Sequence, residues 1–143
     1  MTRVGAPEIV TQKRIIRLFE KELGYTYLGD WQEREGNSNL EMELLTAYLR
    51  DTAGYGEQQI SKALHQLRTE ANHPQRSLYD NNKAVYDLLR YGANVKVGAG
   101  EQSEDVYFID WKNPEANHFA IAEEVTLRGN HTRRPDLVLY VNG

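Results

Sequence analysis

The stretch NHFAIAEEVTLRGNHTRRPDLVLYVNG, residues 117–143, decides the predicted fold because it holds two strand patterns joined by a polar, basic loop. Residues 119–127 alternate between two faces, which predicts a half-buried strand. One predicted face carries Phe119, Ile121, Val125 and Leu127, and the other carries Ala120, Ala122 and Thr126. Residues 137–141 are continuously apolar and predict a buried strand. Pro135 suits the approach to that strand, since proline has no ladder donor to lose.

The second strand pattern ends in Asn142-Gly143, which is a strong two-residue hairpin signal because both residue types tolerate positive φ. A turn at this point predicts a further strand after Gly143. The chain is therefore expected to be a fragment of a longer protein.

Length and composition predict one domain with an ordinary core. The chain has 143 residues, of which 40% are hydrophobic and 27% charged, and it has no cysteine to form disulfides or thiolate metal sites. The N-terminus lacks the apolar core of a signal peptide, and a cytoplasmic location without a membrane partner is expected. A net charge of −4 argues against general coating of nucleic acid, but it leaves room for a local basic site.

The front half of the chain is predicted to be helical. Four helices are expected: from Pro7 to a stop at Gly24, from Leu40 to near Gly54, from about Glu57 to Ala71, and from about Asp80 to Tyr91. Ser38-Asn-Leu-Glu41 is a capping-box pattern for the second helix.

Short extended segments are expected at 25–31 and 94–97, and a central strand at 106–111. The fold class is therefore α+β, a single domain over 1–143 with a helical part at 7–92 and an antiparallel β meander at 94–143.

Asp136 stands where an apolar strand begins, next to arginines. A carboxylate there could ligate a divalent metal while arginines hold phosphate oxygens. It could equally cap a turn or pair with Arg133 or Arg134, and exposed ion pairs are far commoner than metal sites. The residues by themselves leave both interpretations open.

Glu123 shares the parity of the apolar face, so an ideal strand would turn it toward the core. A buried carboxylate needs a partner or a shifted pKa. It could serve a site as an additional acid, swing outward at a bulge, or pair with a buried arginine. Glu124 is expected to be solvated.

Arg128, Arg133 and Arg134 make the loop 128–134 the main local concentration of positive charge, which fits either nucleic-acid phosphates or a solvated hairpin loop. His118 and His131, with Glu123 or Glu124, could be imagined as a zinc site, but no recognised ligand spacing supports one.

Several stretches, in order, resemble one family: LGYTYLGDW at 23–31, LYDNNKAVYDLLRYG at 78–92, VYFIDWKNP at 106–114, and the stretch at 117–143 with its terminal RPDLVLYVNG. The chain resembles the N-terminal endonuclease domain of the restriction (R) subunit of type I restriction-modification enzymes. NHFAIAEE and RRPDLVLYVNG are the most specific parts, and the resemblance covers nearly the whole chain.

The resemblance implies a nuclease site of the PD-(D/E)xK kind, built on an antiparallel hairpin beside a helix. Pro135-Asp136 matches the PD, so Asp136 is implied as the first catalytic carboxylate and a ligand of Mg²⁺. The ExK pair of the family would follow Gly143. A helical acid often completes such sites, and Gln12, Glu8 and Glu20 lie in the helix where it is expected.

The implied parent protein is a type I site-specific deoxyribonuclease that cuts and translocates double-stranded DNA. It would bind ATP in motor domains outside this chain and work with modification and specificity subunits. One alternative is a non-catalytic, nuclease-like module that docks on the methyltransferase complex or on DNA. A weaker one is a separate metal-dependent hydrolase using His118 and His131.

The isolated 143-residue chain is expected to have no cleavage activity, because half of the implied metal-binding set follows Gly143. Incubation of plasmid DNA with the chain and Mg²⁺ should leave the plasmid supercoiled. Nicking that requires Mg²⁺ and disappears in Asp136→Ala would contradict this expectation.

Overall fold

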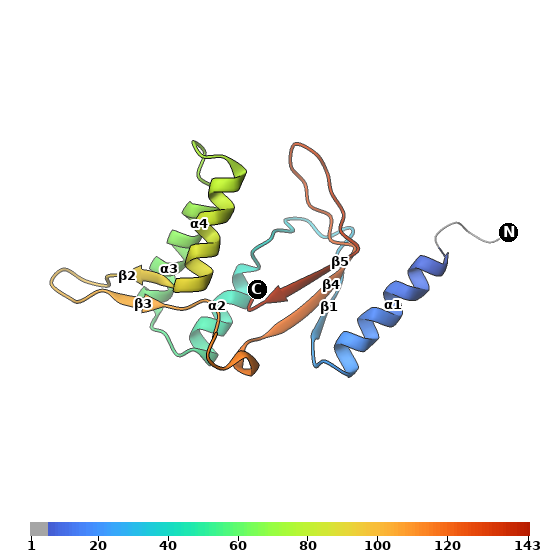
Figure 1. Ribbon diagram of the computed structural model, residues 1–143, viewed down its shortest axis with the longest axis horizontal. Coiled ribbons are helices and arrows are strands. Elements are labelled where there is room, and N and C mark those ends of the chain that lie inside the picture. Colours follow the sequence, from blue (N-terminus) through green and yellow to red (C-terminus); the bar gives the residue numbers. More distant parts are fainter. Residues whose placement is uncertain (1–5) are drawn as a thin grey trace. The chain divides into compact units, whose positions relative to one another are not determined.

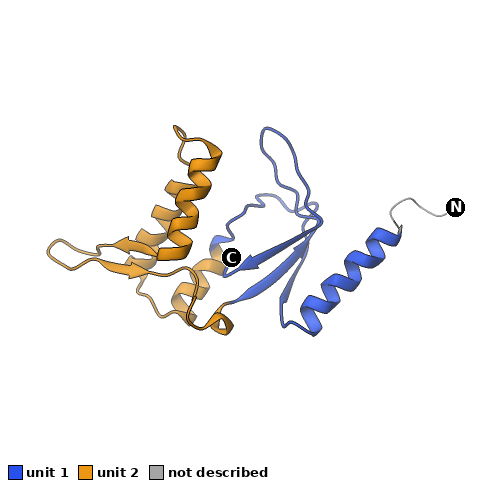
Figure 2. Cartoon of the chain, viewed as in Figure 1, with its two compact units in different colours: residues 1–42, 118–143 blue, residues 43–117 orange. Residues whose placement is uncertain are grey.

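The computed structural model describes residues 6–143 and divides them into two compact units (Figure 2). Unit 1 holds the described residues up to 42 together with 118–143, and unit 2 holds 43–117. Helices and strands occur in both units, which confirms the α+β class. The prediction that 1–143 folds as a single domain is not tested by this division and stays a prediction.

Unit 1 is built on a three-stranded sheet in the order β1-β4-β5 (Figure 1). Its strands are β1 (Thr26–Asp30), β4 (Phe119–Glu123) and β5 (Leu137–Val141). The antiparallel pairing of β4 with β5, from Phe119 opposite Val141 to Glu123 opposite Leu137, confirms the two predicted strands.

The predicted antiparallel meander over 94–143 needs a correction, because β1 pairs with β4 in parallel. The third strand of the sheet therefore comes from far earlier in the chain. Local patterning predicts that a segment is extended, but it does not say which distant segment will be its partner.

The alternation predicted for 119–127 fails at Glu124, whose φ is 52°. Before this residue, Ala120 and Ala122 face the side of the sheet where Trp31 and Tyr140 pack. After it, Val125 and Leu127 join the same side instead of the side of Ile121. A single left-handed residue reverses the parity of those that follow, so the predicted faces are wrong beyond Glu123.

The other face of the sheet is covered by α1 (Ala6–Lys21). Ile16 of the helix and Ile121 of β4 are both buried. Phe19 packs edge-on to Tyr25 at 4.8 Å between ring centroids, and Tyr25 in turn contacts Phe119 at 5.4 Å. The helix ends at Lys21, three residues before the predicted stop at Gly24, which has a φ of 74°.

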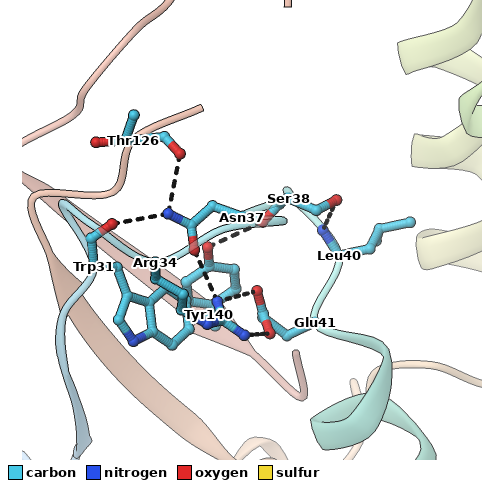
Figure 3. A network of polar contacts seen from close by, with 8 residues as sticks. All are labelled: Trp31, Arg34, Asn37, Ser38, Leu40, Glu41, Thr126 and Tyr140. Atoms are coloured by element: carbon cyan, nitrogen blue, oxygen red, sulfur yellow. Dashed lines mark hydrogen bonds and ion pairs between the residues drawn. The ribbon is translucent and has the colours of Figure 1, made fainter. Parts of the chain in front are cut away.

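The polar loop after β1 is held to the sheet by a compact network (Figure 3). The Arg34 guanidinium lies 3.7 Å from the centroid of the Trp31 ring, and it donates two 3.0 Å hydrogen bonds to the Glu41 carboxylate. Asn37 Nδ2 donates to the carbonyls of Trp31 and Thr126 at 2.9 and 3.0 Å. Because Glu41 is engaged by Arg34, the predicted capping box does not form, and the helix begins at Met42.

The helices of unit 2 follow the sequence prediction closely. They are α2 (Met42–Ala47, entering from unit 1), the π-helix η1 (Tyr48–Thr52), α3 (Glu57–Ala71), α4 (Leu78–Tyr91) and the 3-10 helix η2 (Pro114–Ala116). Ser77 is the N-cap of α4, and its hydroxyl accepts a 3.1 Å hydrogen bond from Asp80 N. Gly92, with a φ of 85°, follows the last residue of the helix.

The strands of unit 2 are β2 (Ala93–Val95) and β3 (Glu104–Val106), which form an antiparallel pair. The central strand predicted at 106–111 is wrong, since only Val106 is in a strand. Phe108 is buried whereas Tyr107 and Trp111 are exposed, so the apolar run is an irregular segment anchored by one core residue.

None of the helices described over residues 6–143 has both the length and the apolar character needed to cross a membrane.

Ile121 and Leu139 are cross-strand partners that test how much the α1-covered face stabilises the chain. Ile121→Ala should lower the free energy of unfolding by about 2–5 kcal/mol, because Ile121 is fully buried. Leu139→Ala is the matched control: its side chain is 49% exposed, and the loss should stay below about 1 kcal/mol. Urea unfolding measures both, and equal losses would contradict the assigned core.

Candidate metal and DNA site

A hollow of about 430 Å³ lies between α1 and the start of β5. Its lining residues are Pro7, Glu8, Thr11, Gln12, Ile15, Asp136 and Leu137. Asp136 is exposed at a bend immediately before β5. The bend is held by the backbone, since Glu124 N donates to Asp136 O at 2.9 Å and Val125 N donates to Pro135 O at 3.1 Å. The structure thus presents the predicted carboxylate at the mouth of an open hollow.

Two residues of α1 share this hollow with Asp136. Glu8 and Gln12 are four residues apart and therefore lie on the same helix face. Gln12 is buried, and its Nε2 donates a 3.3 Å hydrogen bond to Glu124 Oε1, which orients the amide nitrogen toward Glu124. Glu20 is absent from the lining of the hollow and lies where its charge acts on Tyr27. Of the helical candidates, the structure brings Gln12 and Glu8 to Asp136, but not Glu20.

Glu124 is partly buried, which corrects the expectation that it is solvated. Its Oε2 atom is buried and lies 2.9 Å from Arg134 Nε, with the separation of an ion pair but not the geometry of a hydrogen bond. The sequence feature that could have indicated a partly buried Glu124 is the Glu123-Glu124 pair at the end of an alternating strand. Its meaning depends on the positive φ of Glu124, which the sequence pattern does not reveal.

Glu123 is 2% exposed and both of its oxygens have partners. Lys13 Nζ lies 2.5 Å from Oε1, and the Tyr27 hydroxyl donates to Oε2 at 2.9 Å. An ion pair of Glu123, one predicted option, therefore exists, but with a half-exposed lysine in place of a buried arginine. Glu123 does not line the hollow of Asp136, and its role as an additional acid stays a prediction.

The basic loop presents its arginines in two ways. Arg128 and Arg133 are exposed, and Arg133 is held through backbone hydrogen bonds of 2.7 and 2.9 Å with Leu127. Arg134 is paired with Glu124, so the predicted alternative of an ion pair with Asp136 is not seen in the described part of the chain.

The two candidate histidines have separate settings. His118 Nε2 lies 3.1 Å from Thr26 Oγ1, whereas His131 is exposed in the basic loop. Within residues 6–143, no group of three or more His, Cys, Asp or Glu residues is arranged to hold a metal ion. A zinc site built on these histidines gains no support from this geometry.

The donor chemistry of the hollow fits magnesium. Asp136 and Glu8 offer carboxylate oxygens, and Gln12 offers an amide oxygen. Mg²⁺ prefers oxygen ligands and is usually bound through one or two carboxylates with several waters retained. The described residues of the hollow therefore offer oxygen donors of the kind that Mg²⁺ prefers.

Residues 6–143 match the family described as Type I restriction enzyme R protein N terminus. The chain belongs to this family and is the N-terminal region of a type I restriction enzyme R subunit.

A curated relative points the same way. The chain is 29% identical over 150 residues to a Methanocaldococcus jannaschii protein named "Putative type I restriction enzyme MjaVIIIP endonuclease subunit". The alignment covers 100% of this chain and 14% of that protein. The chain thus spans about one seventh of the length of this curated relative.

Tyr27 offers a pH test of the contact with Glu123. Burial, followed by the hydrogen bond to the Glu123 carboxylate, raises the pKa of Tyr27 from 10.0 to about 12. The unfolded chain loses this proton near pH 10 while the folded chain keeps it, so the stabilising contribution of Tyr27 is complete below pH 10 and is lost between pH 10 and 12. The loss is moderated by solvent, since Tyr27 is more than a third exposed.

The measurement compares the wild-type chain with Tyr27→Phe across this range. The absorbance difference at the tyrosinate band should titrate near pH 12, and the difference in free energy of unfolding should shrink from pH 10 upward. A stability difference that does not vary with pH would show that folding does not raise the pKa of Tyr27.

Proposed function

We propose that this chain forms the first half of the magnesium-dependent nuclease site of a type I restriction subunit. The observation that carries the proposal is the exposed Asp136 at the start of β5, opposite Gln12 and Glu8 in the hollow against α1. Membership in the R-protein family supports the same assignment.

Asp136 is the residue proposed to bind the metal and to be catalytic. Gln12 or Glu8 would complete the part of the coordination sphere that this chain supplies. A magnesium ion bound there would polarise a DNA phosphodiester and make a bound water more acidic. The task of the chain would be to present fixed oxygen ligands. The backbone hydrogen bonds of Pro135 and Asp136 with Val125 and Glu124, the two residues after β4, support this role.

The arginines are proposed to position the DNA backbone. Arg128 and Arg133 are exposed, and guanidinium groups match the geometry of phosphate oxygens. Arg134 differs, because it pairs with Glu124, which in turn accepts a hydrogen bond from Gln12. This chain of contacts would keep one positive charge close to Asp136.

The wider activity is proposed from the resemblance of the sequence and the family. The parent protein would be an ATP-dependent endonuclease and translocase of double-stranded DNA, a type I site-specific deoxyribonuclease. ATP would bind to motor domains outside this chain. The modification and specificity subunits would be its protein partners.

A second candidate is a nuclease-like module that docks on the methyltransferase complex or on DNA without cutting. It is favoured by the lack of a three-residue ligand cluster for a metal within the described range. The nuclease candidate requires Asp136 for DNA cleavage. The docking candidate requires Asp136 for neither cleavage nor assembly.

The test is Asp136→Asn in the full-length subunit, assembled with its modification and specificity subunits. DNA cleavage should fall at least about 100-fold, since one essential ligand has lost its charge. ATP hydrolysis and assembly should be unchanged. Asp105→Asn is the matched control. Asp105 is an exposed aspartate of β3 in unit 2, where it accepts a hydrogen bond from Asn94 of the same unit.

Normal cleavage by Asp136→Asn would refute the nuclease assignment. If the wild-type assembly cuts DNA and this variant cuts it equally well, the docking module becomes the better interpretation. Equal loss in Asp105→Asn would mean that the effect is not specific to the hollow.

A further inference from the structure

Unit 2 contains a cleft of about 540 Å³ that the nuclease assignment does not use. Its walls come from the end of η1, the end of α4 and the irregular segment 107–112. The aromatic and positively charged side chains that line the cleft are Tyr48, Tyr55, Tyr107, Trp111, Arg90 and Lys112. Aromatic rings and two cations thus line one opening.

The Trp111 ring is fixed although half of the residue is exposed. Its Nε1 donates a 2.8 Å hydrogen bond to Leu89 O in the last turn of α4, where a carbonyl has no helical partner. The Arg90 guanidinium lies 5.2 Å from the Trp111 ring centroid, within cation–π range. Trp111 is 49% exposed, so an immobilised aromatic surface faces solvent.

Tyr107 is held in a similar way on the same segment. Its backbone N–H donates to the Tyr55 hydroxyl at 3.0 Å. The Tyr107 ring packs against Gly92, where an added Cβ would stand 3.1 Å from two ring carbons and from the Val106 carbonyl. Gly92 therefore allows the close approach that sets this ring, in addition to ending α4.

The wall formed by η1 has an unusual backbone. Ala53 N donates to Tyr48 O, five residues earlier, at 2.9 Å, which closes a π-helical turn after α2. Such π-turns are rare and are frequent at functional sites. They bring Thr52 and Ala53 to the cleft beside the buried Tyr48.

The charges select among ligand classes. A cationic ligand would suit the aromatic rings, but Arg90 and Lys112 would repel it. A purely apolar ligand would leave both cations without a partner. A planar ring that carries a phosphate satisfies both features, since bases stack on aromatic side chains and phosphate oxygens bind cations.

Asp110 also lines the cleft, as its acidic component. Its Oδ1 accepts from Lys112 N at 3.1 Å and from Asn113 N at 2.8 Å, which fixes the turn that carries Lys112. A carboxylate in this position can in addition accept from the amino group of a base. Its charge therefore favours a base that has such a donor.

We propose that the unit 2 cleft binds one nucleotide, with the base stacked on Trp111 or Tyr107 and the phosphate held by Lys112 and Arg90. The nucleotide could belong to an unpaired DNA strand or be free in solution, since the recognised chemistry is the same. The inference does not rest on the Asp136 site, which lies in the other unit.

The experiment uses the full chain and follows the Trp111 indole N–H by NMR. The probes are dAMP, dCMP, ribose 5-phosphate, a labelled single-stranded 12-mer and its duplex. The nucleotides or the single strand should shift the Trp111 signal, whereas ribose 5-phosphate should not. Binding of both free nucleotides and the strand indicates a general nucleotide site, and binding of the strand alone indicates unpaired DNA.

The variants separate stacking from charge. Trp111→Ala should weaken binding roughly 5- to 150-fold by fluorescence anisotropy of the labelled strand, through the lost stacking surface. Lys112→Ala should weaken it less and lower the salt dependence by about one phosphate contact. Tyr79→Ala is the control, since Tyr79 is an exposed tyrosine of α4 outside the cleft.

Trp111→Phe keeps an aromatic ring and guards against misfolding of the alanine variant. It should retain most of the affinity, and circular dichroism checks that each variant is folded. The proposal is overturned if no nucleotide or strand binds, or if ribose 5-phosphate binds as well as dAMP. It is also overturned if a folded Trp111→Ala variant binds the single strand like Tyr79→Ala, or if the duplex binds as tightly as the single strand. The readout here is binding and not DNA cleavage, so failure of this proposal is distinct from failure of the nuclease proposal.

Discussion

Hydrogen bonding along both edges of β4 is the constraint on which unit 1 depends. This strand pairs in parallel with β1 on one side and antiparallel with β5 on the other. Ala120, Ile121 and Ala122 are completely buried, so water cannot replace those hydrogen bonds. The strand thereby fixes where α1 can pack and where β5 begins.

Two consecutive acids at the end of β4 attach the helix to the sheet. Glu123 meets Lys13 of α1, and Glu124 meets Gln12, the preceding residue of the same helix. The contacts differ in kind, since one is an ion pair and the other joins a carboxylate to an amide. Together they set the rotation of α1 that brings Gln12 and Glu8 to the hollow of Asp136.

Two exposed aromatic residues of unit 2, Trp111 and Tyr107, are each held in place by a specific polar or steric contact. Trp111 is bonded to the end of α4, and Tyr107 is set between the Tyr55 hydroxyl and Gly92. An aromatic side chain that is exposed yet fixed loses little conformational entropy when a ligand stacks on it. In both units, then, the central residue of the proposed site, Asp136 or Trp111, lies in a bend, and the neighbouring helices and strands hold that bend in place.

Local features of the fold were accessible from the sequence. The extent of α3, the stop at Gly92, the two strands of the terminal stretch and the position of Asp136 at a strand start follow from periodicity, glycine and proline. Each of these depends on neighbouring residues alone. The parallel pairing of β1, the failed capping box at Glu41 and the loop at 107–111 depend on distant partners, which compete with local preference.

The same division holds for the candidate site. The sequence determined that an acid stands beside arginines at the start of β5, because those residues adjoin one another in the chain. Only the tertiary structure decided that Arg134 pairs with Glu124 instead of Asp136, and that Gln12 and Glu8 face the same hollow. The reason is physical: the φ of 52° at Glu124 and the docking of α1 arise from packing between segments more than one hundred residues apart, as the contact between Gln12 and Glu124 shows.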